Sequence, residues 1–142
     1  MFQQMTIVGN LGGDPEMRYF EDGTAVTNFS VATNRKWKNQ ATGELDEETM
    51  WFRVSAFGAQ AENCNKYLKK GRQVLVQGRM TGESSTGGPR LWTAQDGTVR
   101  ASFEIRAFTV QFLGGAGEEG GGNGGQVAPG TRAAVEEDEI PF

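Results

Sequence analysis

The sequence contains no histidine, and this absence excludes several common enzyme chemistries. Ser-His-Asp and Cys-His catalysis, zinc sites of the His-Glu-x-x-His type and the usual near-neutral proton shuttle all need an imidazole. The single cysteine, Cys64, cannot form an intramolecular disulfide or a cysteine-rich metal site, and it indicates a reducing compartment. We therefore expect a non-enzymatic protein with no cofactor and no metal, located in the cytoplasm.

Long apolar runs and an excess of positive charge are also missing. No apolar run of about 18 residues occurs, and the first six residues lack a basic region followed by an apolar stretch, so we expect neither membrane insertion nor secretion. Lysine and arginine total 14 against 18 aspartate and glutamate, a net charge of −4. A site for a polyanion must then be a local patch, not a uniformly basic surface.

Glycine and acidic residues divide the chain after Leu113. Residues 114–142 hold 9 of the 21 glycines and six acidic residues against one arginine, a net charge of −5, while residues 1–113 carry +1. The second segment has too few large apolar residues to offset chain entropy, so we expect a disordered, Gly-rich tail after a folded domain of residues 1–113. Residues 136–142 (EEDEIPF) form an acidic tip with an apolar end.

The folded part shows alternating and β-branched patterns broken by Gly and Asp-Gly turns, which predicts an all-β domain with one helix. We place strands at residues 4–11, 25–35, 48–57, 73–81 and 98–112, and the helix at 59–70. The apolar residues of the last strand change phase, which predicts a bulge near Arg106 or Ala107. This order of elements matches the OB-fold, a partly open five-stranded barrel that binds oligonucleotides or oligosaccharides.

The third predicted strand has an unusual outer face. Successive side chains of a strand point to opposite sides of the sheet. The side chains expected to face the core are Met50, Phe52, Val54 and Ala56 in this strand, and Val74, Val76, Gly78 and Met80 in the fourth. Trp51, Arg53 and Phe57 then face outward, where a solvated sheet would carry polar residues. Such a face indicates a bound ligand or a partner chain.

Two further tryptophans lie outside the predicted core. Trp37 follows the second strand among three basic residues, and Trp92 lies near Arg90 in the long connection at 82–97. Aromatic rings flanked by cations are typical of proteins that bind unpaired nucleic acid strands, because the rings stack on any base and the cations neutralise phosphates. We therefore predict sequence-tolerant binding of single strands.

Single features allow other interpretations. Trp51 could be covered by another subunit, and Lys66, Lys69 and Lys70 could serve as helix-end charges. The acidic tip could act only as a solubility device. For the whole chain, the alternatives are an RNA-binding OB-fold module of the cold-shock type and a carboxylate-dependent glycosidase.

Several spaced segments resemble the bacterial single-stranded DNA-binding protein family. They are VGNLGGDPEMRY at 8–19, NFSVAT at 28–33, WFRV at 51–54, KKG at 69–71 and DEIPF at 138–142. The resemblance implies that Trp37, Trp51, Phe57 and Trp92 stack on bases and that Arg53, Lys70 and Arg90 contact phosphates. Arg35, Lys36 and Lys38, which surround Trp37, complete the predicted DNA-binding set.

The resemblance also implies an assembly and a cellular role. It implies a homotetramer, with Gln73 and Gln111 at subunit interfaces, and partner binding through Asp138, Glu139, Ile140, Pro141 and Phe142. The implied function is sequence-independent binding and protection of single-stranded DNA in replication, recombination and repair. The tip would recruit other proteins to the exposed strands, at the nucleoid.

Overall fold

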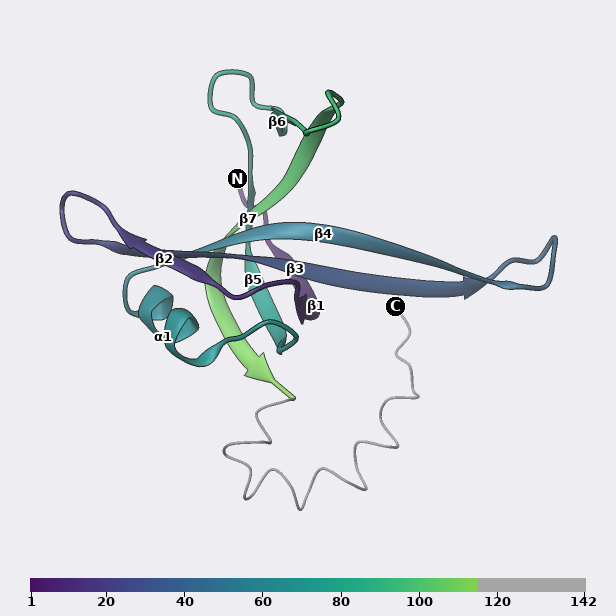
Figure 1. Cartoon of the computed structure of the whole chain (residues 1–142), viewed down its shortest axis with the longest axis horizontal. Coiled ribbons are helices and arrows are strands. Elements are labelled where there is room, and N and C mark those ends of the chain that lie inside the picture. The colour runs from purple at the N-terminus through teal and green to yellow at the C-terminus, as the bar shows by residue number, and fades with distance from the viewer. Residues whose placement is uncertain (115–142) are drawn as a thin grey trace, which may run out of the picture.

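A computed structural model gives the fold of residues 1–114 (Figure 1). The elements are β1 (Met5–Leu11), β2 (Glu16–Tyr19), β3 (Ala25–Lys38), β4 (Leu45–Phe57), α1 (Ala59–Tyr67), β5 (Gln73–Thr81), β6 (Arg90–Thr93) and β7 (Val99–Leu113). The predicted tail at 114–142 lies outside the described residues apart from Gly114, and so does its tip.

The five long strands form a barrel in the order β1, β5, β7, β4, β3. Neighbours are antiparallel except β4 and β7, which run parallel from Phe52 opposite Phe103 to Ser55 opposite Arg106. A short contact between β1 and β3, at Asn10 opposite Ala32 and Leu11 opposite Val31, closes the circuit. The predicted fold class, an all-β OB-fold with one helix, is confirmed.

The barrel interior contains the alternate residues that parity assigned to it. Phe52, Val54 and Ala56 of β4 are buried, as are Val74 and Val76 of β5. The helix packs against the strands through its buried residues Ala61 and Cys64. The hydroxyl of Thr27, buried on β3, donates a hydrogen bond of 2.7 Å to the Ala61 carbonyl oxygen. Apolar burial and a satisfied polar group thus fix the helix on the barrel.

One inward assignment is wrong, that of Met80, which is exposed. Pairing between β1 and β5 ends at Met5 opposite Gly78, so β1 does not extend alongside Met80. The predicted bulge is present in β7: Gln77 pairs with Thr109 and Gly78 with Ala107, which leaves Phe108 without a cross-strand partner. Phe108 is exposed although it shares the parity of Val110 and Phe112, which pack on the core.

The helix is shorter than predicted. It ends at Tyr67, because Leu68 adopts an extended conformation (φ −92°, ψ 150°) and buries its side chain in the core. Lys69 and Lys70 therefore lie beyond the helix, and only Lys66 stands in its last turn. The interpretation of all three lysines as helix-end charges is wrong for two of them.

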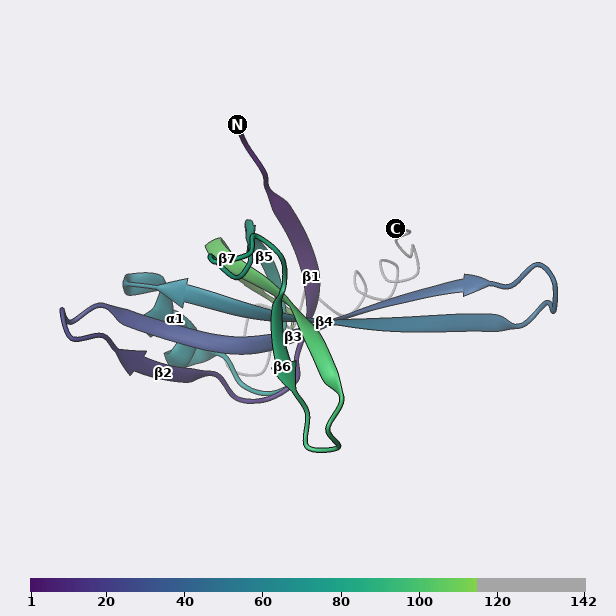
Figure 2. The same cartoon turned by 90° about the horizontal axis from the view of Figure 1, so that it is seen from above.

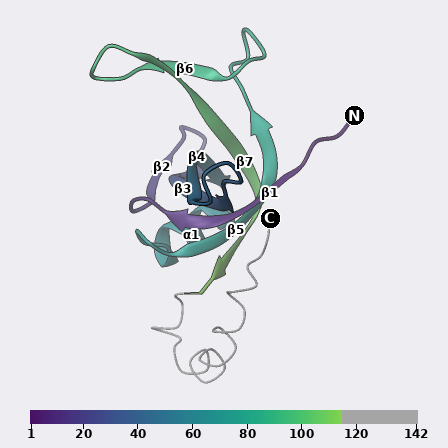
Figure 3. The same cartoon turned by 90° about the vertical axis from the view of Figure 1, so that its right-hand side faces the viewer.

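Two hairpins project from the barrel in different directions (Figures 1 and 2). Strands β3 and β4 stay paired out to Lys38 opposite Leu45, so Trp37 lies within a strand and not after one. The connection at 82–97, predicted without strands, contains β6, which pairs with β7 from Arg90 opposite Ser102 to Thr93 opposite Val99. Figure 3 shows the β6–β7 hairpin standing away from the barrel.

Within residues 1–114, no helix has the length and apolarity needed to span a bilayer.

Candidate nucleic-acid interface

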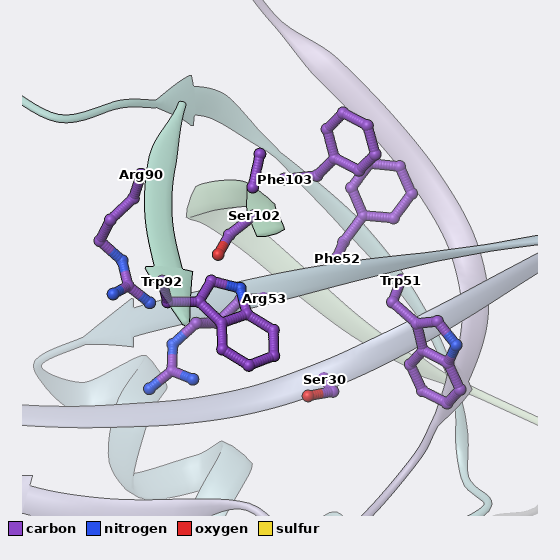
Figure 4. A pocket seen from close by; sticks show the side chains of 9 residues that line it. Ser30, Trp51, Phe52, Arg53, Arg90, Trp92, Ser102 and Phe103 are labelled. Atoms are coloured by element: carbon purple, nitrogen blue, oxygen red, sulfur yellow. The ribbon is translucent and has the colours of Figure 1, made fainter. Parts of the chain in front are cut away.

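A groove between β4 and the β6–β7 hairpin brings together four predicted site residues, Trp51, Arg53, Arg90 and Trp92 (Figure 4). Its volume is about 390 Å³. The other lining residues are Ser30, Phe52, Ala101, Ser102 and Phe103. Trp51 and Arg53 come from the outer face of β4, and Arg90 and Trp92 share one face of β6. Two separate stretches of the chain thus build a single aromatic and cationic surface.

Small neighbours keep the Trp51 indole accessible. In the register of β3 and β4, Trp51 stands opposite Ala32 and Arg53 opposite Ser30. Trp51 is 53% exposed. A Cβ atom at Gly12 would overlap the indole, since it would lie 2.8 Å from Cη2. The ring therefore lies against the Gly12 backbone, and Gly12 is a site residue that the sequence analysis missed.

Trp92 is supported by an arginine on the neighbouring strand. The Arg100 guanidinium carbon lies 5.9 Å from the centre of a Trp92 ring, and Arg100 stands opposite Trp92 in the β6–β7 register. The Asp96 carboxylate lies 3.6 Å from the same guanidinium. Arg100 was not predicted as a site residue. Alternation along the last strand puts Arg100 and Ser102 on one face, but only the pairing of β6 with β7 brings that face beside Trp92.

Arg90 is already paired with a carboxylate. Its Nε donates a hydrogen bond of 2.7 Å to Glu104 on β7. Glu104 was not predicted either, because the sequence does not show which strand runs beside β6. An acidic group therefore binds one of the two predicted phosphate contacts of the groove, Arg90, although Glu104 itself does not line the groove.

Trp37 lies outside this groove, on the β3–β4 hairpin. The Arg35 guanidinium carbon lies 4.4 Å above a Trp37 ring, and Arg35 also forms an ion pair of 2.9 Å with Glu48. Lys36 and Lys38, on the same strand, are exposed. The hairpin therefore pairs one aromatic ring with one arginine and carries two further exposed cations.

Phe57 is less available than its parity suggested. It is half-buried, it stacks on Phe20 at 6.2 Å between ring centres, and the Arg106 guanidinium carbon lies 4.2 Å from its own ring centre. Phe20, which follows β2, is 48% exposed. The sequence does not reveal Phe20 and Arg106 as neighbours of Phe57, because Phe20 follows β2 and Arg106 lies on β7, and only the fold brings them to β4.

Lys70 stands in the turn after α1 and does not line the groove. Its backbone N–H donates 2.9 Å to Asp14, and its side chain is exposed. Asp14 lines a smaller, polar pocket of about 150 Å³ that shares Ser30 and Arg53 with the groove. Lys70 is thus held by a residue that borders the same surface.

The predicted subunit-interface residues Gln73 and Gln111 do not line the groove. Gln73 and Gln111 lie on the outer face of β5 and β7, where Leu75 pairs with Gln111. Burial raises the pKa of the Cys64 thiol to about 12, so the sulfur stays protonated and unreactive. Residues 1–114 contain no group of three or more His, Cys, Asp or Glu side chains placed to hold a metal ion. The predicted tip residues lie outside this part of the chain.

Comparison with known proteins identifies a family and similar proteins. Residues 2–113 match the Single-strand binding protein family. Single-stranded DNA-binding protein 1 of Xylella fastidiosa (strain 9a5c) is 42% identical over 111 residues, which are 78% of this chain and 76% of that protein. A solved Plasmodium falciparum SSB complex with ssDNA is similar at a TM-score of 0.64 and 28% identity, covering 80% of this chain and 96% of that one. The chain belongs to the single-strand binding protein family.

Proposed function

We propose that this protein binds single-stranded DNA without sequence preference. The observation that carries the proposal is the groove in which Trp51 and Trp92 stand exposed beside Arg53 and Arg90. Family membership and the named relatives support the same ligand.

Stacking and charge neutralisation supply the binding energy. Each base stacked on an aromatic ring contributes roughly 1 to 3 kcal/mol, whatever its identity. Phosphates that pair with arginine release counterions, so affinity falls as salt rises. Duplex DNA hides its base faces, and the groove therefore favours an unpaired strand.

The cellular role follows from this binding. The protein coats and protects exposed strands during replication, recombination and repair, in the cytoplasm at the nucleoid. It acts as a homotetramer, in which the outer face with Gln73, Leu75 and Gln111 lies between subunits. The tip at 136–142 recruits other proteins through its acidic and apolar residues. The exposed apolar side chain of Val8, which pairs with Leu75, supports the assembly.

Titration of tryptophan fluorescence with a deoxythymidine homopolymer tests the proposal. We expect strong quenching that saturates, because Trp37, Trp51 and Trp92 would lie against bases. A matched uridine homopolymer in competition should bind more weakly, whereas tighter RNA binding would favour a cold-shock-type module. Absence of both quenching and binding to the deoxy polymer would refute the proposed function.

A further inference from the structure

All three ion pairs within residues 1–114 hold arginines that stand near the tryptophans of the proposed interface. They are Arg35 with Glu48 beside Trp37, Arg100 with Asp96 beside Trp92, and Glu104 with Arg90, which lines the groove together with Trp92. A carboxylate beside a surface that binds a polyanion opposes binding by charge repulsion. A carboxylate at such a surface is therefore expected to favour binding in some other way that offsets the repulsion.

The pair between Arg90 and Glu104 differs from the other two. It is the shortest, at 2.7 Å, and only 20% of the Glu104 side chain is exposed. In the other pairs every side chain is at least 44% exposed, and ion pairs of that kind constrain their partners weakly. A short charge-assisted hydrogen bond with a shielded acceptor instead fixes the direction of the donor.

The position of Glu104 determines which part of Arg90 stays free. Glu104 lies on β7, two residues after Ser102, which pairs with Arg90 of β6, and its own cross-strand partners are Arg53 of β4 and Thr81 of β5. The carboxylate accepts from Nε of Arg90, and the hydrogen bonds formed within residues 1–114 include none from the two terminal nitrogens. Figure 4 shows the guanidinium groups of Arg53 and Arg90 on the side of the Trp92 indole away from Trp51.

We propose that Glu104 is a positioning residue for strand binding. It holds Arg90 by Nε, so that the two terminal nitrogens point as a planar fork to a phosphate of the strand that stacks on Trp92. The proposal rests on the proposed function. Its physical basis is preorganisation: an arginine fixed in the free protein loses little rotamer freedom when the phosphate arrives, and this gain offsets the repulsion by the carboxylate.

Two substitutions separate the hydrogen bond from the charge. Glu104→Gln keeps an oxygen that accepts from Arg90 Nε but removes the negative charge, whereas Glu104→Ala removes both. We expect the Gln variant to bind a deoxythymidine oligomer at least as tightly as the unaltered protein. The Ala variant should bind about fivefold more weakly than the Gln variant, the loss expected when one long side chain is immobilised only on binding.

The role of Arg90 is tested by repeating both substitutions in an Arg90→Ala background, where the difference between Gln and Ala should disappear. Glu48→Gln and Glu48→Ala, at an exposed pair, give the baseline difference. Equal affinities of the two Glu104 variants, or a difference that persists without Arg90, would overturn the positioning role. If Glu104→Ala does not fold, Arg90→Lys tests the proposal instead, because lysine keeps the positive charge but lacks the planar fork of donors. Unchanged affinity of the Arg90→Lys variant would overturn the proposal. Failure of the unaltered protein to bind the oligomer would instead refute the proposed function itself.

Discussion

Trp51 depends on a neighbour that has no side chain. Because a Cβ atom at Gly12 would overlap the indole, Gly12→Ala should turn the ring away from the groove and weaken binding of a deoxythymidine oligomer. We expect a loss of about 1 to 3 kcal/mol, as for Trp51→Ala, the value of one stacked base. The double variant should lose no more than Trp51→Ala alone.

Gly13→Ala is the matched control, since a Cβ atom there would meet nothing within 4 Å. Its affinity and its fluorescence quenching should equal those of the unaltered protein. Equal affinities of the Gly12 and Gly13 variants would mean that the position of the Trp51 ring does not matter for binding.

Phe20 stacks on Phe57 and is the more exposed of the two rings. A base can therefore stack on Phe20 more easily than on Phe57. We expect Phe20→Ala to weaken single-strand binding by about 1 kcal/mol, the lower end for one stacked base. Phe108→Ala removes a phenylalanine of similar exposure at the bulge in β7 and should leave affinity unchanged. If both variants bind like the unaltered protein, Phe20 only covers Phe57.

Residue parity in the long strands could be predicted from the sequence, and it placed Trp51 and Arg53 on the correct face. It could not reveal Gly12, Glu104 or Phe20, because each meets its site residue through a contact between two different elements of the fold. Alternation fixes the face of a side chain but not its neighbour on the next strand. The roles of the predicted site residues stay predictions.

At the scale of elements, the sequence predicts the long strands from their alternating pattern but does not predict the two short strands. Strands β2 and β6 each have four residues and pair on one side only, with β3 and β7 respectively. Their patterns are too short for a period to emerge. The end of α1 was misplaced for another reason: Leu68 leaves the helix to bury its side chain, so tertiary packing overrides a helical pattern.

The β3–β4 hairpin should contribute charge to binding independently of the groove. Lys36 and Lys38 are exposed on it beside Trp37. Replacing both by alanine should make the dependence of log affinity on log salt shallower by up to about 1.4, since each phosphate contact on a single strand contributes about 0.7. The double substitution of Lys66 and Lys69, exposed near the end of α1, removes the same charge and should leave the slope unchanged. Equal slopes for the two double variants would show that the hairpin makes no phosphate contact.

At the scale of the whole molecule, the outer face of β1, β5 and β7 predicts assembly. Val8 is 43% exposed and pairs with Leu75, which pairs in turn with Gln111. We expect sedimentation as a homotetramer at micromolar concentration, because contact between subunits would bury the exposed Val8 side chain and its neighbour Leu75. Val8→Glu should shift the protein toward smaller species, whereas Leu45→Glu, which adds the same charge at the exposed end of the β3–β4 hairpin, should leave the sedimentation unchanged. A monomer for the unaltered chain would contradict the assembly.

Charge is divided unequally along the chain, and this division predicts competition for the groove. Residues 1–113 carry +1 and residues 114–142 carry −5, so we expect attraction between the two parts to compete with the attraction of DNA phosphates. A Gly-rich segment of this length spans roughly 30 Å as a random coil, about the size of a small domain. Removing residues 114–142 should therefore raise affinity for a deoxythymidine oligomer at low salt, and the gain should fade as the Debye length falls to about 8 Å at physiological ionic strength.

Removing only 140–142 keeps all six acidic residues, so it should leave DNA affinity unchanged while abolishing capture of replication and repair proteins. An equal gain in affinity from both deletions would show that the apolar end, not the charge, occupies the groove.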